Sequence, residues 1–467
     1  MQAKATGSYL AAVTGNAAKR PVFVFIDRSI STIVSFFGVV YSGNFYVPVD
    51  SQLPANRIQL MIETIRPAAI IYSGENIPGP GLVYEGPVVK LSEAVSCPAA
   101  DSLLDKIRRG HLDIDPLYAM FTSGTTGIPK GALISHRGVI DLAEGFAEVF
   151  ELSEDCSYCN CAPFDFDVST KDIYLNLKCM GTMHIAPKMA AVFPVQLIEF
   201  LNERKINTLI WATSVLRVIH SSDAFEAIRP EHLRLVMFSG EVMPNKVLNY
   251  WRKHFPEVEF VNLYGPTEIT CNCTYFKVNR DFSDAEPLPI GNPFPNTGVL
   301  LLDGDKQVSG PGAVGEICVG GTCLALGYYN DMARTMESFV RNPLNPAYPQ
   351  TIYRTGDLGC YNSFGELVFI GRSDHQIKYL GHRIELGEIE GAVNALDFLD
   401  FGCCIYDDQS EKIVLFYQAA EKCEKRIMSS LMLMLPKYMI PKKMVYYQRL
   451  PLNKNGKIDR ALLKQYL

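Results

Sequence analysis

The feature that most constrains the fold of this chain is the alternation of short, wholly apolar runs with amphipathic segments. Runs rich in Val, Ile and Phe occupy residues 21–26, 68–73, 207–212, 233–240 and 258–265. Helix-like segments such as residues 193–205 lie between them and are closed by Gly or Pro. Strands that are buried on both faces give continuous apolar runs, whereas half-exposed strands alternate. The pattern therefore predicts α/β layers with mostly parallel sheets.

The sequence pattern of the chain changes after about Asp281. Residues 297–303, 314–321 and 365–372 form short, Gly-punctuated segments of the kind found in β-hairpins. We therefore predict a large N-terminal core of α/β layers over residues 1–373, with a β-rich part at about 281–373. From Asp374 onward an α+β pattern predicts a small C-terminal subdomain, residues 374–467. Because no low-complexity linker separates the two, the boundary is expected to be a short hinge.

Size and composition exclude several classes of protein. The 467 residues, 48% of them hydrophobic, suffice for a large core and more than one domain. A net charge of −6 offers no basic surface, so no nucleic acid is expected as a partner. The N-terminus lacks a signal-peptide pattern, and Gly and polar residues interrupt the apolar stretch 33–49, so no membrane partner is expected. The 13 cysteines lack zinc-site spacing, and a cytoplasmic location is expected.

The most specific motif is YAMFTSGTTGIPKG, residues 118–131. An apolar strand runs directly into a loop of Gly, Ser and Thr that ends at Lys130. Glycines let the backbone turn tightly and present its N–H groups, and hydroxyls and a lysine add further donors to a polyphosphate. It is not a Walker loop, because no Ser or Thr follows Lys130. We predict a phosphate site made by Thr122, Ser123, Gly124, Thr125, Thr126, Gly127 and Lys130.

Three later motifs supply further groups for a nucleotide. In NLYGPTE, residues 262–268, Tyr264 can present a flat ring to adenine, and Glu268 can hold Mg²⁺, which prefers oxygen ligands and substrate phosphates. In YRTGDL, residues 353–358, Asp357 can accept hydrogen bonds from ribose hydroxyls. In GRSDHQIK, residues 371–378, Arg372 adds a second ribose or phosphate contact.

These motifs, in this order, resemble those of the ANL superfamily of adenylate-forming enzymes. The resemblance runs from about Ser42 to Arg460 and is greatest to nonribosomal peptide synthetase adenylation domains and D-alanine–carrier protein ligases. It implies ATP and Mg²⁺, with Asn262 and Gly265 also at the nucleotide. It further implies contacts of Tyr264 with adenine, of Thr267 with the α-phosphate, and of Glu268 with the metal.

The resemblance also assigns roles near the C-terminus. GHRIELGEIE, residues 381–390, is similar to the motif that serves the thioester-forming half-reaction. Lys457, in PLNKNGKIDR, matches the lysine that bridges the substrate carboxylate and the α-phosphate. Such a lysine stabilises the charge that develops in the transition state. Asp374 matches the hinge about which the family's mobile C-terminal subdomain turns. By the same likeness, the chain begins inside an early helix and is expected to lack residues usual at the family's N-terminus.

FDFDVSTKDIY, residues 164–174, points to the amino-acid branch of the family. Asp167 matches the carboxylate that pairs with the substrate's α-ammonium group, and a helix N-cap is its alternative and compatible role. Lys171, four residues on, can pair with Asp167, extend to solvent, or bind an acidic or polar substrate side chain. Either Ile210 or Trp211 is expected as a further wall. The resemblance implies a pocket lined by Asp167, Val168, Lys171, Met237, Ser239, Leu263, Cys271 and Asn272.

The function implied is ATP-dependent adenylation of an amino acid, followed by transfer to the phosphopantetheine thiol of a carrier protein. D-alanine–carrier protein ligase and acyl- or aryl-CoA ligase are alternatives within the family, the last with CoA in place of the carrier. A non-catalytic nucleotide-binding protein is the alternative of another class. A monomer is expected.

Overall fold

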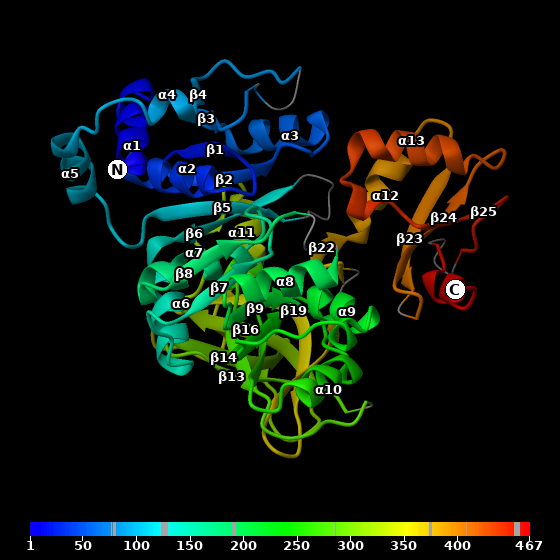
Figure 1. The fold of residues 1–467 in the computed structure, drawn as a ribbon. Helices are drawn as coiled ribbons and strands as arrows, with labels where there is room; N and C mark the ends of the chain where they lie inside the picture. Colours follow the sequence, from blue (N-terminus) through cyan, green and yellow to red (C-terminus); the bar gives the residue numbers. More distant parts are fainter. Residues whose placement is uncertain are drawn as a thin grey trace.

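The computed structural model describes residues 1–75, 77, 81–122, 129–188, 193–284, 286–372, 376–407, 409–452 and 458–467. Within these ranges the chain forms a large α/β core and a smaller C-terminal lobe, which lie side by side (Figure 1). None of the described helices combines the length and the apolar character that a membrane crossing requires. The mixed α/β class expected from the sequence is confirmed.

The first sheet is built from the N-terminal part of the chain. Its central strands are parallel, and their residues are almost all buried, as the continuous apolar runs predict. The described strands, in spatial order, are β17 (Gly327–Tyr328), β6 (Lys130–Ser135), β5 (Pro116–Thr122), β2 (Phe45–Asp50), β1 (Pro21–Ile26), β3 (Ala69–Tyr72) and β4 (Val88–Lys90). Helix α3 (Ala55–Ile65) covers one face through Ile58 and Met61, whereas α1 (Gln2–Val13) and α2 (Ile30–Tyr41) pack on the other.

A second, longer sheet joins parallel and antiparallel strands. Its parallel part contains β8 (Thr182–Ile185), β7 (Ser157–Asn160), β9 (Thr208–Ala212), β10 (Leu235–Ser239) and β11 (Glu259–Tyr264). The antiparallel part continues through β12 (Thr274–Lys277), β13 (Pro289–Pro293), β20 (Leu367–Arg372), β19 (Thr351–Tyr361), β16 (Gly315–Gly321), β14 (Thr297–Asp303) and β15 (Lys306–Gln307), with β18 (Phe339–Arg341) beside β19. The segments expected to be hairpin-like are thus strands that continue the core sheet.

Two helices form the layer between these sheets. In α6 (His136–Val149) and α7 (Val168–Cys179), Val139 and Ile173 face the first sheet, whereas Leu142 and Leu175 face the second. The opposite face of the second sheet is covered by α8 (Pro194–Glu203), α9 (Thr213–Ser221) and α10 (Asn245–His254). Because α7 begins in this central layer, its N-terminal residues lie where both sheets end.

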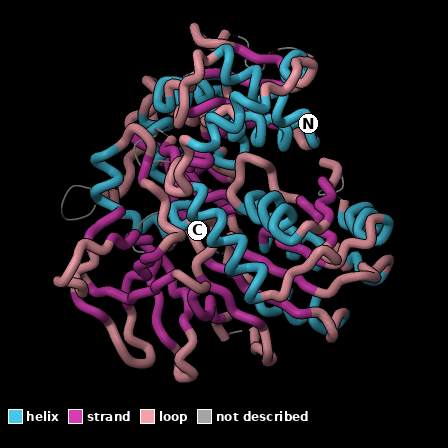
Figure 2. The backbone as a smooth tube through the Cα atoms, turned by 90° about the vertical axis from the view of Figure 1, so that its left-hand side faces the viewer, coloured by secondary structure: helices cyan, strands magenta, loops and turns pink. Residues whose placement is uncertain are grey.

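The C-terminal lobe has a hydrophobic core of its own. A hairpin, β21 (Gln376–Tyr379) and β22 (His382–Glu385), leads into α12 (Leu386–Asn394). The sheet of β23 (Phe401–Asp407), β24 (Lys412–Gln418) and β25 (Lys443–Tyr447) is flanked by α13 (Glu424–Met434) and α14 (Arg460–Lys464). Helices α12 and α13 pack on one face of this sheet and α14 packs on the other, and Figure 2 shows the helices of the molecule in cyan beside its strands in magenta. The boundary at 373/374 stays a prediction, since residues 373–375 lie outside the described ranges.

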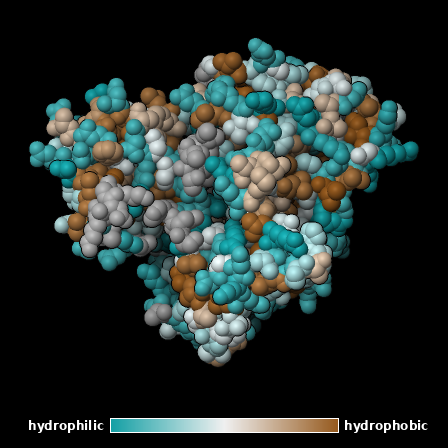
Figure 3. Space-filling model, turned by 180° about the vertical axis from the view of Figure 1, so that it is seen from behind, coloured by the Kyte–Doolittle hydropathy of each residue, from teal (hydrophilic) through white to brown (hydrophobic). Residues whose placement is uncertain are grey.

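The lobe contacts the core through defined pairs. Arg57 of α3 forms a buried ion pair with Glu388 of α12, and α3 packs against α13. Arg217 of α9 pairs with Glu411 beyond β23. Between the two parts lies a cleft of about 1250 Å³, and a hollow is visible there in the surface seen from behind (Figure 3).

Candidate active site

The two ends of the predicted phosphate loop are held by a hairpin. Strands β5 and β6 are antiparallel, and Thr122 lies directly opposite Lys130. The loop glycines and hydroxyls predicted to bind phosphate, Ser123, Gly124, Thr125, Thr126 and Gly127, lie outside the described residues. The Thr122 hydroxyl is buried and makes no hydrogen bond within the described part of the chain. The hairpin therefore sets Lys130 and the Thr122 hydroxyl at the base of the loop.

Glu268 is the centre of a buried charged cluster. Its Oε1 accepts a hydrogen bond from the Tyr328 hydroxyl at 2.7 Å and lies 3.5 Å from Lys130 Nζ. Its Oε2 lies 2.5 Å from a guanidinium nitrogen of Arg383, which β22 brings in from the C-terminal lobe. Burial alone would raise the pKa of the Glu268 carboxyl, but Arg383 and Lys130 outweigh burial and hold it well below its ordinary value. Glu268 is therefore ionised at neutral pH.

Asp167 lies beside this cluster in a different environment. It precedes α7 at the N-cap position but makes no capping hydrogen bond. Its Oδ2 instead accepts a 2.6 Å hydrogen bond from the Thr267 hydroxyl. The residue is 8% exposed, and burial raises the pKa of its carboxyl against the effects of Thr267 and the more distant Lys171. No ion pair to Asp167 occurs within the described ranges, so the site holds a buried carboxylate beside Glu268 that is ready for a cation.

A second group of predicted residues surrounds a small cavity at the end of β11. The Tyr264 hydroxyl donates to Asp357 Oδ2 at 2.6 Å, and Arg372 contacts the other carboxylate oxygen. Asn262 donates to the Pro289 carbonyl at 2.8 Å. The cavity, of about 80 Å³, is lined among others by Gly240, Glu241, Asn262, Leu263, Tyr264, Gly265, Phe369 and Lys378. Aromatic, carboxylate and cationic groups thus converge within one cavity wall, as a nucleoside requires.

The residues predicted for the substrate pocket lie around the first turns of α7. Val168, Met237, Leu263 and Cys271 are all buried. Ile210 packs in the same cluster as Met237 and Leu263, whereas the indole N–H of Trp211 donates to the Cys159 carbonyl on the opposite face of the sheet. Of the two alternatives, Ile210 therefore lies on the side of the pocket residues, because successive residues of a strand point to opposite faces.

The structure excludes two of the three roles considered for Lys171, extension to solvent and pairing with Asp167. Its side chain is 0% exposed, so it does not extend to solvent, and it forms no ion pair with Asp167. Its Nζ donates instead to Asn272 Oδ1 at 2.6 Å, and it lies 3.5 Å from Ser239 Oγ. Three predicted pocket residues, on α7, β10 and the turn after β11, are thereby joined.

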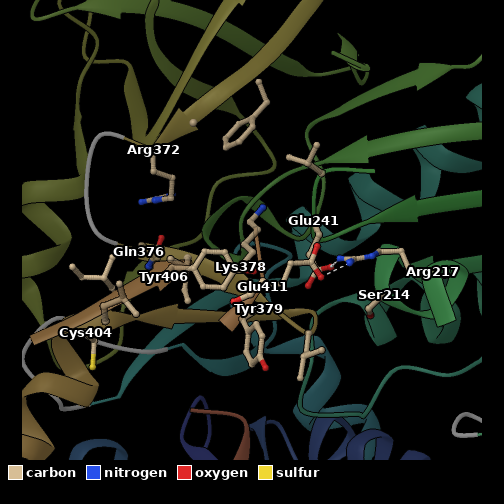
Figure 4. Close-up of a pocket in the computed structure, with 18 of the residues that line it drawn as sticks. Ser214, Arg217, Glu241, Arg372, Gln376, Lys378, Tyr379, Cys404, Tyr406 and Glu411 are labelled. Atoms are coloured by element: carbon tan, nitrogen blue, oxygen red, sulfur yellow. Dashed lines mark hydrogen bonds and ion pairs between the residues drawn. The ribbon is translucent and has the colours of Figure 1, made fainter. Parts of the chain in front are cut away.

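The cleft between core and lobe opens onto the nucleotide residues. Asp357 and Arg372 line it on the core side, and Lys378, Cys404 and Arg460 line it on the lobe side. Figure 4 shows Arg217 directed toward Glu241 and Glu411 at one side of the cleft, with Lys378 between them and Arg372. The predicted Lys457 and Asp374 lie outside the described residues.

Sequence reasoning missed several residues of this site. Tyr328, Arg383, Lys378 and Glu241 were not singled out, although the hairpin carries two of them against the core. The Gly381 amide donates to Glu241 Oε1 at 2.6 Å, and Lys378 Nζ lies 5.7 Å from the Tyr264 ring centre. Two motifs contained residues of this hairpin: residues 371–378 end at Lys378 and residues 381–390 include Arg383. Both motifs indicated a function for their segment and not the partners of these residues.

Comparison with known proteins gives one consistent result. The AMP-binding enzyme family matches residues 1–329. The chain is 32% identical over 451 residues to tyrocidine synthase 3 of Brevibacillus parabrevis, covering 95% of this chain and 7% of that protein. It is 32% identical over 458 residues to the D-alanine–D-alanyl carrier protein ligase of Bacillus licheniformis, covering 95% of this chain and 89% of the ligase.

A solved structure gives the same fold. PA1221, an NRPS protein containing adenylation and PCP domains, is 26% identical with a TM-score of 0.83, covering 100% of this chain and 78% of that one. The chain spans under a tenth of the synthase that it matches, so that protein's overall activity does not carry over.

Proposed function

Because the chain belongs to the AMP-binding enzyme family, it is an adenylate-forming enzyme, and we propose that its substrate is an amino acid. ATP and the amino acid would give aminoacyl-AMP and pyrophosphate. The aminoacyl group would then pass to the phosphopantetheine thiol of a carrier protein. The presence of carrier-linked enzymes among the relatives supports the second step.

The observation that carries the proposal is the state of Asp167. A buried carboxylate is costly unless a cation or several donors compensate it. Among the described residues, Asp167 accepts a hydrogen bond from the Thr267 hydroxyl and takes part in no ion pair. An amino acid brings an α-ammonium group that supplies the missing charge. Fatty and aryl acids bring no such group, and a CoA ligase for them would leave this carboxylate uncompensated.

The neighbouring residues fit the chemistry of adenylation. In the first step a carboxylate oxygen of the amino acid attacks the α-phosphorus of ATP, and pyrophosphate leaves. Lys130, and by resemblance Lys457, would stabilise the negative charge that develops on the phosphate oxygens. In the second step the thiol sulfur attacks the acyl carbon, AMP leaves, and the thiol proton is released. Asp357, Arg372 and Tyr264 would hold the nucleoside through both steps.

Magnesium fits this site in one specific way. The described residues contain no cluster of three or more potential metal ligands. Mg²⁺ at nucleotide sites is commonly held by one or two carboxylates together with substrate phosphates, so Glu268 suffices as the protein ligand. The metal would supply charge neutralisation of the phosphates. Because Arg383 contacts Glu268 Oε2 at 2.5 Å, this carboxylate must change partner before it can hold the metal.

A second candidate, D-alanine–carrier protein ligase, is favoured by the similar length of that relative. It requires the same chemistry and differs only in the pocket. A small substrate would leave the ammonium group of Lys171 with neutral partners only.

The test is pyrophosphate exchange with a panel of amino, aryl and fatty acids, for wild type and Asp167→Asn. We expect exchange with an amino acid, and a KM for it raised roughly tenfold or more by Asp167→Asn, since charged hydrogen-bonded pairs are worth about 1.5–3 kcal/mol. The KM for ATP should change little. The exposed Asp101→Asn serves as control, because Asp101 pairs with Lys4 at the surface. Exchange with aryl or fatty acids alone would instead identify a CoA ligase, and ATP binding without any exchange a non-catalytic protein.

A further inference from the structure

Lys171 is a buried cation whose observed partners are neutral. Its Nζ donates to the Asn272 side-chain oxygen at 2.6 Å, with the Ser239 hydroxyl 3.5 Å away. The side chain has no exposed surface, and it takes part in no ion pair within the described ranges. Burying an ammonium group without a counter-charge is strongly unfavourable. The site is therefore electrostatically incomplete as it stands.

The two acids nearest in sequence do not complete it. Asp167 is engaged by Thr267, and Asp172 accepts a 2.8 Å hydrogen bond from the Asn160 amide. Burial raises the pKa of Asp172 to about 7, so Asp172 is a weak counter-charge at neutral pH. An Asp167 that paired with Lys171 would also be lost to the α-ammonium group of the substrate.

The geometry points to an acidic amino acid as the substrate. Resting on the proposed function, we propose that Lys171 binds the side-chain carboxylate of that substrate while Asp167 binds its α-ammonium group. Lys171 lies four residues along α7 from Asp167, a rise of about 6 Å. The negative charge of Asp167 would thus face the positive α-ammonium group at the Cα of an acidic amino acid. The positive charge of Lys171 would face the negative carboxylate at the end of its side chain.

The surrounding side chains fit this class. Ser239 and Asn272, which already contact Lys171, offer a hydroxyl and an amide N–H₂ to a carboxylate. Ile210, Met237 and Leu263 form an apolar wall suited to a short aliphatic stem. The rival arrangement is that the Lys171 stem fills the pocket and leaves room for Gly or Ala only. The two arrangements predict opposite rankings of substrates.

The experiment compares pyrophosphate exchange with Asp and Glu, their neutral isosteres Asn and Gln, and Gly, Ala, Leu and Met. For wild type, kcat/KM for the acid should exceed that for its amide by at least about tenfold, because a polar site discriminates strongly against a mismatched isostere. Lys171→Met keeps the stem and removes the charge, so this ratio should fall to about one or below. Lys178→Met is the matched control, since Lys178 lies on the exposed side of the same helix and pairs with Glu144.

A second measurement separates loss of recognition from loss of folding. The acidic amino acid with ATP should raise the melting temperature of wild type and of Lys178→Met but not that of Lys171→Met. Without ligands, the melting temperature of Lys171→Met should be no lower than that of wild type. Preference of wild type for Gly, Ala, an amide or an apolar amino acid, unchanged in Lys171→Met, would overturn the inference and leave the proposed function standing. Exchange with no amino acid at all would overturn both.

Discussion

Two neighbouring buried carboxylates in this site are held in opposite electrostatic states. Glu268 contacts Arg383 and Lys130, which outweigh the effect of burial and keep it ionised. Within the described part of the chain, Asp167 accepts a side-chain hydrogen bond from the Thr267 hydroxyl alone, and burial dominates its pKa. Such a pair of environments separates the roles of two acids. Glu268 is suited to a metal ion and Asp167 to a cation that arrives with the substrate.

This difference predicts a pH dependence for the KM of the amino acid. Binding requires an ionised Asp167, whose pKa is raised, and a protonated α-ammonium group on the substrate. Below the pH at which the substrate's ammonium group deprotonates, the KM should therefore rise as the pH falls through the pKa of Asp167. Thr267→Val removes a donor that lowers this pKa, so the rise should begin at higher pH. It should also increase the KM about tenfold at neutral pH, since an unsatisfied buried acceptor costs about 1–3 kcal/mol.

The measurement is pyrophosphate exchange at saturating ATP from mildly acidic to alkaline pH. Thr267→Ser keeps the hydroxyl and should restore the wild-type profile. Identical KM profiles for wild type and Thr267→Val would show that this hydrogen bond does not control Asp167.

The sequence predicted the members of this pair but not all of their partners. Thr267 and Glu268 lie in one short motif, and Asp167 lies in a local pattern before a helix, so neighbouring residues identified all three. Tyr328 and Arg383 reach Glu268 from 60 and 115 residues further along the chain. No local sequence pattern identifies either residue as a contact of Glu268, because these contacts depend on how strands β17 and β22 are placed in the fold.

At the scale of elements, the hairpin of β21 and β22 links the lobe to the site. Its turn contains Gly381, whose φ of 81° is in the left-handed region that favours glycine and directs its N–H toward Glu241. Arg383, two residues later, reaches Glu268, and Lys378, before the turn, lies near the ring of Tyr264. One hairpin therefore contacts both the metal-binding and nucleoside residues proposed for the core.

We expect Arg383→Ala to separate the two half-reactions. In the arrangement observed, Arg383 neutralises Glu268, the residue proposed to hold Mg²⁺, so guanidinium and metal compete for one carboxylate. Removing Arg383 should leave pyrophosphate exchange near wild type, or lower the Mg²⁺ concentration that it requires. Transfer of the aminoacyl group to a phosphopantetheine thiol should fall by roughly tenfold or more, since truncating one partner of a buried charged pair costs about 2–5 kcal/mol.

Single-turnover transfer and pyrophosphate exchange, each titrated with Mg²⁺, provide the measurement. Arg372→Ala is the comparison, because Arg372 contacts Asp357 and should impair both half-reactions. A loss of exchange in Arg383→Ala that equals the loss of transfer would contradict this role for the hairpin.

The strands themselves were largely predictable. All five apolar runs form strands, β1, β3, β9, β10 and β11, because strands that are buried on both faces of a covered sheet have continuous apolar sequences. The sequence did not show that β13 pairs with β20 and with β12, which in turn pairs with β11, so that the antiparallel and parallel strands form one sheet. Such pairing links residues far apart in the chain and leaves no periodic signal in either segment.

At the scale of the whole molecule, a buried ion pair connects core and lobe in addition to the contact of Arg383 with Glu268. Arg57 of α3 and Glu388 of α12 have side chains only 9% and 1% exposed, and they contact each other across the interface. Breaking a buried pair by removing one partner is costly because the other charge is left uncompensated, whereas removing both is often neutral. The pair is therefore expected to stabilise the arrangement in which the hairpin reaches the site, relative to any other orientation that rotation of the lobe about the proposed hinge at Asp374 would give.

We test this with a double-mutant cycle of Arg57→Met, Glu388→Gln and the double variant. Arg57→Met removes one member of this buried ion pair, a cost of about 3–5 kcal/mol to the closed arrangement, so aminoacyl transfer to the thiol should fall strongly. Pyrophosphate exchange should change much less, because the core residues that hold the nucleotide are untouched. The double variant should recover most of the transfer rate. The alternative outcome is that Arg57→Met lowers both half-reactions equally, lowers the melting temperature as well, and is not rescued in the double variant. That result would show that the pair stabilises the folded chain and does not control the position of the lobe.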